Sequence, residues 1–274
     1  MKQFIEARIS LKQGGDAFDI AVARLSELGF DGFLEEEDHL LAYCETEEPD
    51  SEKVLHKLHS EGFHEVEINL IGNKNWNAEW ESSFAPVQIS DELVIRAPFH
   101  KPVEGVKYDI IIEPKMSFGT AHHETTYLML QAILGLDLNK REVLDMGSGT
   151  GVLAILAWMK GATQALAIDN DEWAYNNAIE NKIRNNADIE VEQGDANSLK
   201  GRCFDIIFAN INRNILLDDI PKYDAVLNSG GSLLMSGFYT DDLPLITEKC
   251  AEAGLEFKAS QTKNNWVAAI FIKP

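Results

Sequence analysis

Cysteine, basic residues and long apolar runs are scarce in this sequence of 274 residues. Its three cysteines, Cys44, Cys203 and Cys250, lie too far apart to match a metal site or a disulfide framework. We therefore expect free thiols, no metal ion and a reducing, cytoplasmic location. No run of about eighteen apolar residues occurs, which argues against a membrane span. The N-terminus also lacks the apolar core of a signal peptide.

Positive charge is the second shortage. The chain has 24 Lys and Arg residues against 45 Asp and Glu residues, and its net charge is −21. Direct binding to nucleic acid requires a basic surface, so this balance argues against a nucleic-acid partner and suits a basic protein partner. Residues 1–72 hold six basic and 17 acidic residues, and this quarter of the chain therefore carries −11 of the net charge.

Residues 1–72 have the pattern of a small α+β domain. We expect helices at 16–28 and 51–61, the second capped by Ser51, and strands at 4–9, 30–34, 40–44 and 66–70. This order is that of a ferredoxin-like fold. The acidic turn 35–38 is either a solvated loop, which we favour, or a specific contact. Residues 73–84 are expected to form a linker in which Trp76 and Trp80 share one helical face.

Residues 85–274 form the second predicted domain, an α/β domain. Short strands are expected at 87–89, 93–96 and 108–112. Strands then alternate with helices to the end of the chain. The expected strands are 143–146, 165–168, 189–193, 204–209, 232–236, 255–261 and 266–272, and the expected helices are 125–134, one from 152, 172–186 and 242–253. This alternation predicts a doubly wound, Rossmann-like sheet with helices on both faces.

The stretch from Val143 to Ala154 is the most informative. An apolar strand, 143–146, is followed by Gly147, Gly149 and Gly151 and then by a helical pattern. In open α/β sheets, nucleotide-type ligands commonly bind where a strand is followed by a glycine turn and a helix N-terminus. Glycine reaches positive φ freely and lets a ligand approach the backbone. A plain structural turn is the alternative.

The glycine spacing distinguishes between possible nucleotide-type ligands. A dinucleotide fingerprint would place its third glycine at Val152, whereas the alternate spacing resembles motif I of seven-strand S-adenosylmethionine (SAM) methyltransferases. Asp145 fits that motif. Asp169 ends the next apolar run, 22 residues after Gly147, where an acid would bind ribose hydroxyls. Asp195, after the third strand, could accept the adenine amino group. SAM is therefore favoured over NAD.

The segment 113–126 contains two adjacent histidines, His122 and His123. Paired histidines suggest a metal ion, but adjacent side chains point apart and no third ligand is near. We expect instead a loop over the cofactor, beside the glycine turn. The fourth strand of the α/β domain ends at Asn210, which is followed by Ile211.

These motifs together resemble the PrmA family, methyltransferases of the large-subunit ribosomal protein L11. The matching residues are Phe118-Gly119-Thr120, His122–Thr126, Asp145–Gly151, Asp169 and Ala209-Asn210-Ile211. The sequence departs from the family at Ala121, where the loop usually has glycine. The resemblance implies SAM contacts from Thr126, Gly147, Asp169 and Asn210. The other candidate cofactor residues are Phe118, Gly119, Thr120, Gly149, Gly151 and Asp195.

The resemblance also implies an activity, the methylation of lysine side chains and of the N-terminal α-amine of L11. Asn210 is the candidate catalytic residue, because its side-chain carbonyl can accept hydrogen bonds from an amine. His122 or His123 could assist in removing a proton. Residues 1–72 would select the substrate and residues 85–274 would carry out the chemistry. The alternatives are methylation of another basic protein or of a nucleic-acid base, and a SAM-fold binding or assembly module without activity.

Overall fold

The computed structural model describes residues 3–10, 17–36, 39–46, 50–71, 85–114 and 119–274. The chain divides into two compact units, Met1–Ser83 and Phe84–Pro274. The tryptophans expected to share a helical face, Trp76 and Trp80, lie outside the described residues.

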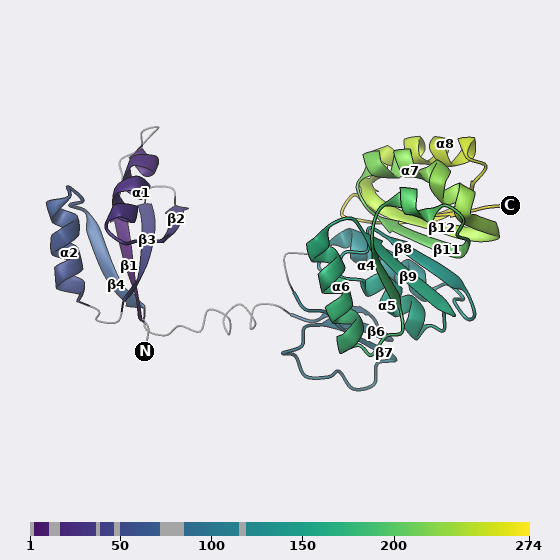
Figure 1. Ribbon diagram of the computed structural model, residues 1–274, viewed down its shortest axis with the longest axis horizontal. Helices are drawn as coiled ribbons and strands as arrows, with labels where there is room; N and C mark the ends of the chain where they lie inside the picture. Colours follow the sequence, from purple (N-terminus) through teal and green to yellow (C-terminus); the bar gives the residue numbers. More distant parts are fainter. Residues whose placement is uncertain (1–2, 11–16, 37–38, 47–49, 72–84, 115–118) are drawn as a thin grey trace. The chain divides into compact units, whose positions relative to one another are not determined.

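The first unit is a four-stranded antiparallel sheet with two helices (Figure 1). Its elements are β1 (Gln3–Ser10), α1 (Ala17–Glu27), β2 (Gly32–Glu36), β3 (His39–Thr46), α2 (Ser51–Ser60) and β4 (Val66–Ile71). The strand order β2-β3-β1-β4 is that of the expected ferredoxin-like fold. Its core includes Ile9, Leu25, Leu40 and Leu58.

One cap in this unit differs from the expectation. Ser51 is the first residue of α2, and the N-cap is Asp50, whose side chain accepts a hydrogen bond from Lys53 N at 3.0 Å. Aspartate and serine are similarly good N-caps, so two such residues in succession leave the cap position ambiguous in the sequence.

The second unit begins with a small sheet. It consists of β5 (Val87–Ser90), β6 (Leu93–Arg96) and β7 (Tyr108–Ile111), in that order. Strand β6 pairs antiparallel with β5 and parallel with β7. Arg96 on β6 is buried and forms an ion pair with Asp109 on β7 at 2.7 Å, which joins these two strands across the sheet.

The main sheet has seven strands in the order β10-β9-β8-β11-β12-β14-β13. Strand β14 runs antiparallel to both of its neighbours, and the other pairs are parallel. This is the predicted Rossmann-like arrangement. Its elements are α4 (Glu124–Leu134), β8 (Glu142–Met146), α5 (Val152–Met159), β9 (Gln164–Asp169), α6 (Glu172–Arg184), β10 (Glu190–Gln193), β11 (Phe204–Asn210), α7 (Arg213–Val226), β12 (Leu227–Tyr239), α8 (Leu243–Glu252), β13 (Glu256–Lys263) and β14 (Trp266–Ile272), with short 3-10 turns η1 (Ala196–Leu199) and η2 (Thr240–Asp242).

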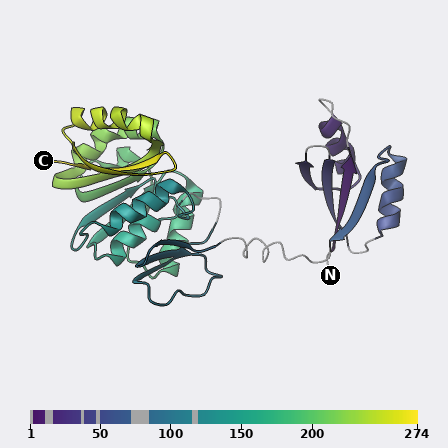
Figure 2. The ribbon, with the colours of Figure 1, turned by 180° about the vertical axis from the view of Figure 1, so that it is seen from behind.

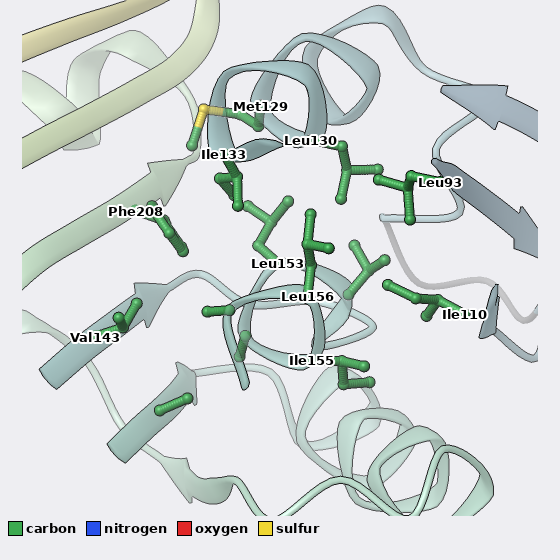
Figure 3. Packing of buried hydrophobic residues seen from close by; sticks show 14 of the residues in the cluster. Leu93, Ile110, Met129, Leu130, Ile133, Val143, Leu153, Ile155, Leu156 and Phe208 are labelled. Atoms are coloured by element: carbon green, nitrogen blue, oxygen red, sulfur yellow. The ribbon is translucent and has the colours of Figure 1, made fainter. Parts of the chain in front are cut away.

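Helices cover both faces of this sheet. Alternate residues of each strand face opposite sides, so Val143 packs with one core and Leu144 with the other. Helices α4 and α5 supply the first core, and α7 and α8 supply the second, as Figures 1 and 2 show from opposite sides. In Figure 3, side chains from α4, α5, the sheet and the small sheet meet in the first core, including Leu93, Leu130, Leu156 and Phe208.

Two elements were not expected in this form. Helix α7 was not predicted, and it contains Pro221, although proline is unfavourable inside a helix. The helix survives because Leu216, Ile220 and Tyr223 are fully buried on one face. Strand β12 begins at Leu227, not at 232, and a register shift opposite Phe204 and Ile206 accommodates Gly230 and Gly231.

Candidate active site

The carboxyl ends of four neighbouring strands bring most of the predicted site residues to one edge of the sheet. Met146 on β8 is paired with Ile168 on β9 and with Ala209 on β11, so Gly147, Asp169 and Asn210 are next to one another. Strand order reverses beside β8, and ligands of open α/β folds bind in the crevice at such a point.

The glycine turn adopts backbone conformations that favour glycine. The φ angles of Gly147, Gly149 and Gly151 are 69°, 54° and 76°. Gly147 N donates to Ile168 O at 2.8 Å, and Gly151 forms the N-cap of α5 without a side-chain hydrogen bond. The turn therefore joins β8 to α5. Its N-cap residue, Gly151, offers no side chain, and Asp145 accepts from Ala154 N in the first turn of the helix instead.

Asp169 is attached to this turn. One of its carboxylate oxygens accepts a hydrogen bond from Gly149 N at 2.8 Å, and the other accepts one from Asp171 N at 3.0 Å. The two backbone donors fix the carboxylate at the end of β9, as a ribose-binding acid requires. Each oxygen keeps a lone pair for a further donor.

Asp145 is buried beneath the turn. One of its carboxylate oxygens accepts a hydrogen bond from Ala154 N at 3.2 Å, and the other has no partner among the described residues. Burial raises the pKa of Asp145 to about 7. The hydrogen bond from Ala154 opposes this rise, and the nearby charge of Asp169 adds to it.

This raised pKa predicts a pH dependence of stability. The unfolded chain loses the Asp145 proton near the ordinary pKa of 3.8, whereas the folded protein keeps it to about 7. Between these two pKa values the folded state binds more protons than the unfolded state. The contribution of Asp145 to the free energy of unfolding therefore falls as pH rises, by at most about 1.4 kcal/mol per pH unit. Asp145→Asn should lack this loss. Urea unfolding of both proteins from pH 5 to 8 measures the difference, and parallel curves would contradict it.

Asn210 contacts Thr126 across the site. Its side-chain Nδ2 donates to Thr126 Oγ1 at 3.3 Å, which joins the end of β11 to the first turn of α4. The Asn210 carbonyl oxygen, Oδ1, is buried without a partner among the described residues. An unpaired buried acceptor is costly, so it points to a donor supplied by a ligand or substrate.

Ile211 is held between two glycines. A Cβ added to Gly147 would overlap Ile211 Cγ2, and one added to Gly237 would overlap the Ile211 carbonyl oxygen. Gly237 lies on β12 with φ 97°, beside the end of β11. The sequence analysis did not single out Gly237, although a glycine inside a strand often marks a close approach of another backbone.

The segment that follows the small sheet reaches the glycine turn. Gly119 O accepts a hydrogen bond from Thr150 Oγ1 at 2.8 Å, so Gly119 is adjacent to the turn, as expected for the loop. Thr120 lies next to it and contacts His122. Ala121 is buried with φ 66°, a backbone conformation that favours glycine, the residue that the family resemblance led us to expect there. Phe118 lies outside the described residues.

The two histidines are held by local contacts. His122 Nε2 lies 3.1 Å from Ala85 O, and its Nδ1 lies 3.2 Å from Thr120 O. His123 is the N-cap of α4, and its ring packs edge-on against Trp266 at 4.8 Å. No group of three metal-ligating side chains occurs in the part of the chain that the structure describes.

Asp195 occupies the expected position after β10, but its carboxylate is turned to a local partner. It caps η1, accepting from Asn197 N at 2.9 Å and from Asn197 Nδ2 at 3.0 Å. The residue is exposed, and a further lone pair on each oxygen remains for an adenine amino group.

The polar groups at this edge fit SAM. The buried polar atoms without a partner among the described residues include three from the glycine turn and the adjoining strand ends: Asp145 Oδ1, Ser148 Oγ and Asn210 Oδ1. Two are acceptors and one is a hydroxyl, which suits a ligand carrying an ammonium group, a carboxylate and a sulfonium. Asp169 adds the ribose acceptor. This set can bind an amino-acid nucleoside and present an acceptor to a second reactant.

Comparisons with known proteins agree with this reading. Residues 23–274 match the family model described as ribosomal protein L11 methyltransferase (PrmA). Proteins of that name from Phocaeicola vulgatus and Bacteroides fragilis are 46% and 44% identical over 261 residues, which cover 93% of this chain and 93% of each relative. The crystal structure of ribosomal protein L11 methylase from Lactobacillus delbrueckii subsp. bulgaricus superposes with a TM-score of 0.65 at 30% identity, covering 69% of this chain and 99% of that one.

A more distant structure shares the fold alone. The methyltransferase from Pyrococcus furiosus superposes with a TM-score of 0.52 at 20% identity, and the match covers 60% of this chain and 89% of that chain. Among the helices that the structure describes, none combines the length and apolar character needed to cross a membrane.

Proposed function

Because the chain belongs to the PrmA family of ribosomal protein L11 methyltransferases, we propose that it uses SAM to methylate L11. The proposed acceptors are lysine side chains and the N-terminal α-amine. The observation that carries the proposal is the unpaired, buried Asn210 carbonyl at the sheet edge that holds the glycine turn and Asp169. All three cysteines are free, which is consistent with action in the reducing cytoplasm.

Ten residues are proposed to hold the cofactor. Gly147, Gly149 and Gly151 shape the turn, and Asp169 binds the ribose hydroxyls. Bound SAM supplies an electrophilic methyl group on its sulfonium. The remaining proposed contacts come from Phe118, Gly119, Thr120, Thr126, Asp195 and Asn210.

Asn210 is proposed to orient the substrate amine. Its Nδ2 already donates to Thr126, which leaves its buried Oδ1 as the acceptor without a partner among the described residues. An N–H of a neutral amine can donate to that oxygen, and the nitrogen lone pair is then directed at the methyl group. Transfer of a methyl group depends mainly on such orientation and on exclusion of water. The tethered histidines are not needed for this step.

The activity can be tested with purified components. The protein is incubated with SAM and unmethylated L11, and L11 is examined by intact-mass and peptide mass spectrometry. We expect whole methyl increments on lysines and on the N-terminus. A mixture of the other ribosomal proteins serves as a specificity control. Methylation of a different basic protein, with L11 unmodified, would favour the alternative substrate class.

We further propose that the first unit selects L11. Residues 1–72 carry −11 of the −21 net charge, and L11 is expected to be a basic partner. The unit has its own core, so it can fold as a separate recognition domain. Tethering a bound substrate near one catalytic site raises its local concentration and would let several amines reach that site.

Removal of the first unit should impair the methylation of L11 without affecting the binding of SAM. A shortened chain of residues 84–274 retains the compact catalytic unit with both of its cores. We expect it to bind SAM normally and to methylate intact L11 about tenfold more slowly or worse. The full chain should also lose rate as salt rises, because exposed charges are screened within about 8 Å at physiological ionic strength. A folded shortened chain with the full rate would rule out the recognition role.

A further inference from the structure

Helix α6 presents a row of asparagines to the rest of the second unit. Asn177, Asn181 and Asn185 are spaced four apart and therefore share one face of the helix. Asn177 and Asn181 are buried, although polar side chains are uncommon in a core. Most buried amides are hydrogen-bonded, so the partners of Asn181 and Asn185 indicate what this row holds in place. Asn177 accepts from Asn181 through its Oδ1, while its Nδ2 has no partner among the described residues.

Asn185 holds the end of the small sheet. Its Oδ1 accepts from Ile111 N at 2.8 Å, and its Nδ2 donates to Ile111 O at 2.7 Å. The Asn185 side chain thus satisfies both backbone groups of Ile111, as a neighbouring strand would. Arg184 forms an ion pair with Glu113 at 2.8 Å two residues further along. These contacts attach the chain leaving β7 to α6.

Asn181 joins that same chain to the glycine turn. Its Oδ1 accepts from Glu113 N at 3.1 Å, and its Nδ2 donates to Thr150 O at 3.0 Å. The same amide group also donates to Asn177 Oδ1 at 3.2 Å. The two main-chain contacts of Asn181 therefore reach residues 113 and 150, which are far apart in sequence.

Thr150 makes the second connection. It is completely buried, and its hydroxyl donates to Gly119 O at 2.8 Å. A Cβ added to Gly119 would lie 2.5 Å from that hydroxyl oxygen, so the close approach depends on glycine. Thr150 lies between Gly149, whose N–H binds Asp169, and Gly151, which begins α5.

We infer that Thr150 and Asn181 are positioning residues that fix the glycine turn against Glu113 and Gly119, and so shape the cofactor site. Neither side chain needs to touch the cofactor. Their hydrogen bonds fix the position of two backbone segments that would flank the cofactor. One is the glycine turn, and the other contains Gly119 and Thr120. The inference rests on the proposed function, because it takes SAM as the ligand of this turn.

The hydroxyl of Thr150 can be tested with two variants, the nearly isosteric Thr150→Val and the smaller Thr150→Ser. Thr150→Val removes only the donor to Gly119 O, whereas Thr150→Ser retains it. Loss of one hydrogen bond that organises the site should weaken binding of S-adenosylhomocysteine about three- to tenfold. The KM for SAM should rise to match, with little change in kcat, because ground state and transition state lose the same contact. Thr150→Ser should bind like the unaltered protein.

A matched control separates positioning from general stability. Asn185→Ala removes the two side-chain hydrogen bonds to the Ile111 backbone and leaves the contacts of the glycine turn intact. It should therefore lower the melting temperature and leave cofactor affinity unchanged. Equal affinity for Thr150→Val and the unaltered protein would overturn the inference. So would a failure of Thr150→Ser to restore binding, or an equal loss of affinity in Asn185→Ala.

A double-mutant cycle tests whether the two residues act together. Asn181→Ser and Thr150→Val should each weaken binding, and their combination should be weaker by less than the product of the two factors. If the two substitutions weaken binding by independent, multiplicative factors, Thr150 and Asn181 are not energetically coupled. If the unaltered protein binds no S-adenosylhomocysteine, both this inference and the proposed cofactor fail. If it binds the cofactor and the variants behave as expected but L11 is not methylated, only the substrate proposal fails.

Discussion

Replacing Asn210 by alanine is expected to slow methyl transfer on the order of a hundredfold while changing cofactor affinity only a few-fold. The side-chain Nδ2 donates to Thr126 at 3.3 Å, and the buried Oδ1 acceptor has no partner among the described residues. An interaction made mainly at the reacting centre lowers kcat more than it raises the dissociation constant of SAM. Single-turnover transfer to L11 and calorimetry with S-adenosylhomocysteine measure the two quantities separately.

Asn212→Ala is the matched control for this experiment. Asn212 lies two residues further along the chain and caps α7, where its side chain accepts from Ile215 N at 3.2 Å. Loss of this cap should cost about 1 kcal/mol of stability and leave turnover nearly unchanged. Wild-type turnover in Asn210→Ala, or an equal loss in Asn212→Ala, would exclude a direct role for Asn210 in the chemistry.

Replacing Gly237 by alanine is expected to destabilise the protein by about 3–5 kcal/mol. The new Cβ would overlap the Ile211 carbonyl oxygen and lie 2.7 Å from the carbonyl carbon, and φ is 97°. Ile211 cannot retreat easily, because Gly147 contacts its other side. The strain should therefore displace the Asn210-Ile211 backbone and weaken cofactor binding as well. Denaturant unfolding and calorimetry measure the two effects.

Gly230 provides the control in the same strand. It also has positive φ, 77°, but nothing lies within 4 Å of an added Cβ. Gly230→Ala should therefore cost only the conformational penalty, about 1 kcal/mol. If Gly237→Ala unfolds at the same denaturant concentration as Gly230→Ala, the close packing around Ile211 does not constrain the site.

Much of the site could be predicted because its residues lie at the ends of strands. The pattern of apolar runs followed by Gly147, Asp169 and Asn210 is local, and parallel strands bring their carboxyl ends to one edge. The alternate glycines indicated the turn, since each requires a conformation that other residues rarely adopt. The succession of elements also predicted a doubly wound sheet and a ferredoxin-like unit, while the order of the seven strands came from the structure.

Some local features were predicted wrongly because two local rules compete. Pro221 reads as a helix breaker, yet α7 continues through it, since three buried residues on one face outweigh the lost hydrogen bond. Likewise Asp50, and not Ser51, caps α2, and nothing in the sequence alone ranks one above the other. Packing and the exact path of the backbone settle such cases.

By itself, the sequence determined the order of the strands and of most helices, the glycine turn, the acid at the end of β9 and the asparagine at the end of β11. Only the tertiary structure decided the contacts between them. Thr126 meets Asn210, Asn181 meets Thr150, and Gly237 meets Ile211, each across 26 residues or more. Hydrophobic period and turn conformation are properties of neighbouring residues. These contacts depend instead on where whole elements pack, and no local pattern specifies which buried side chains will then face each other.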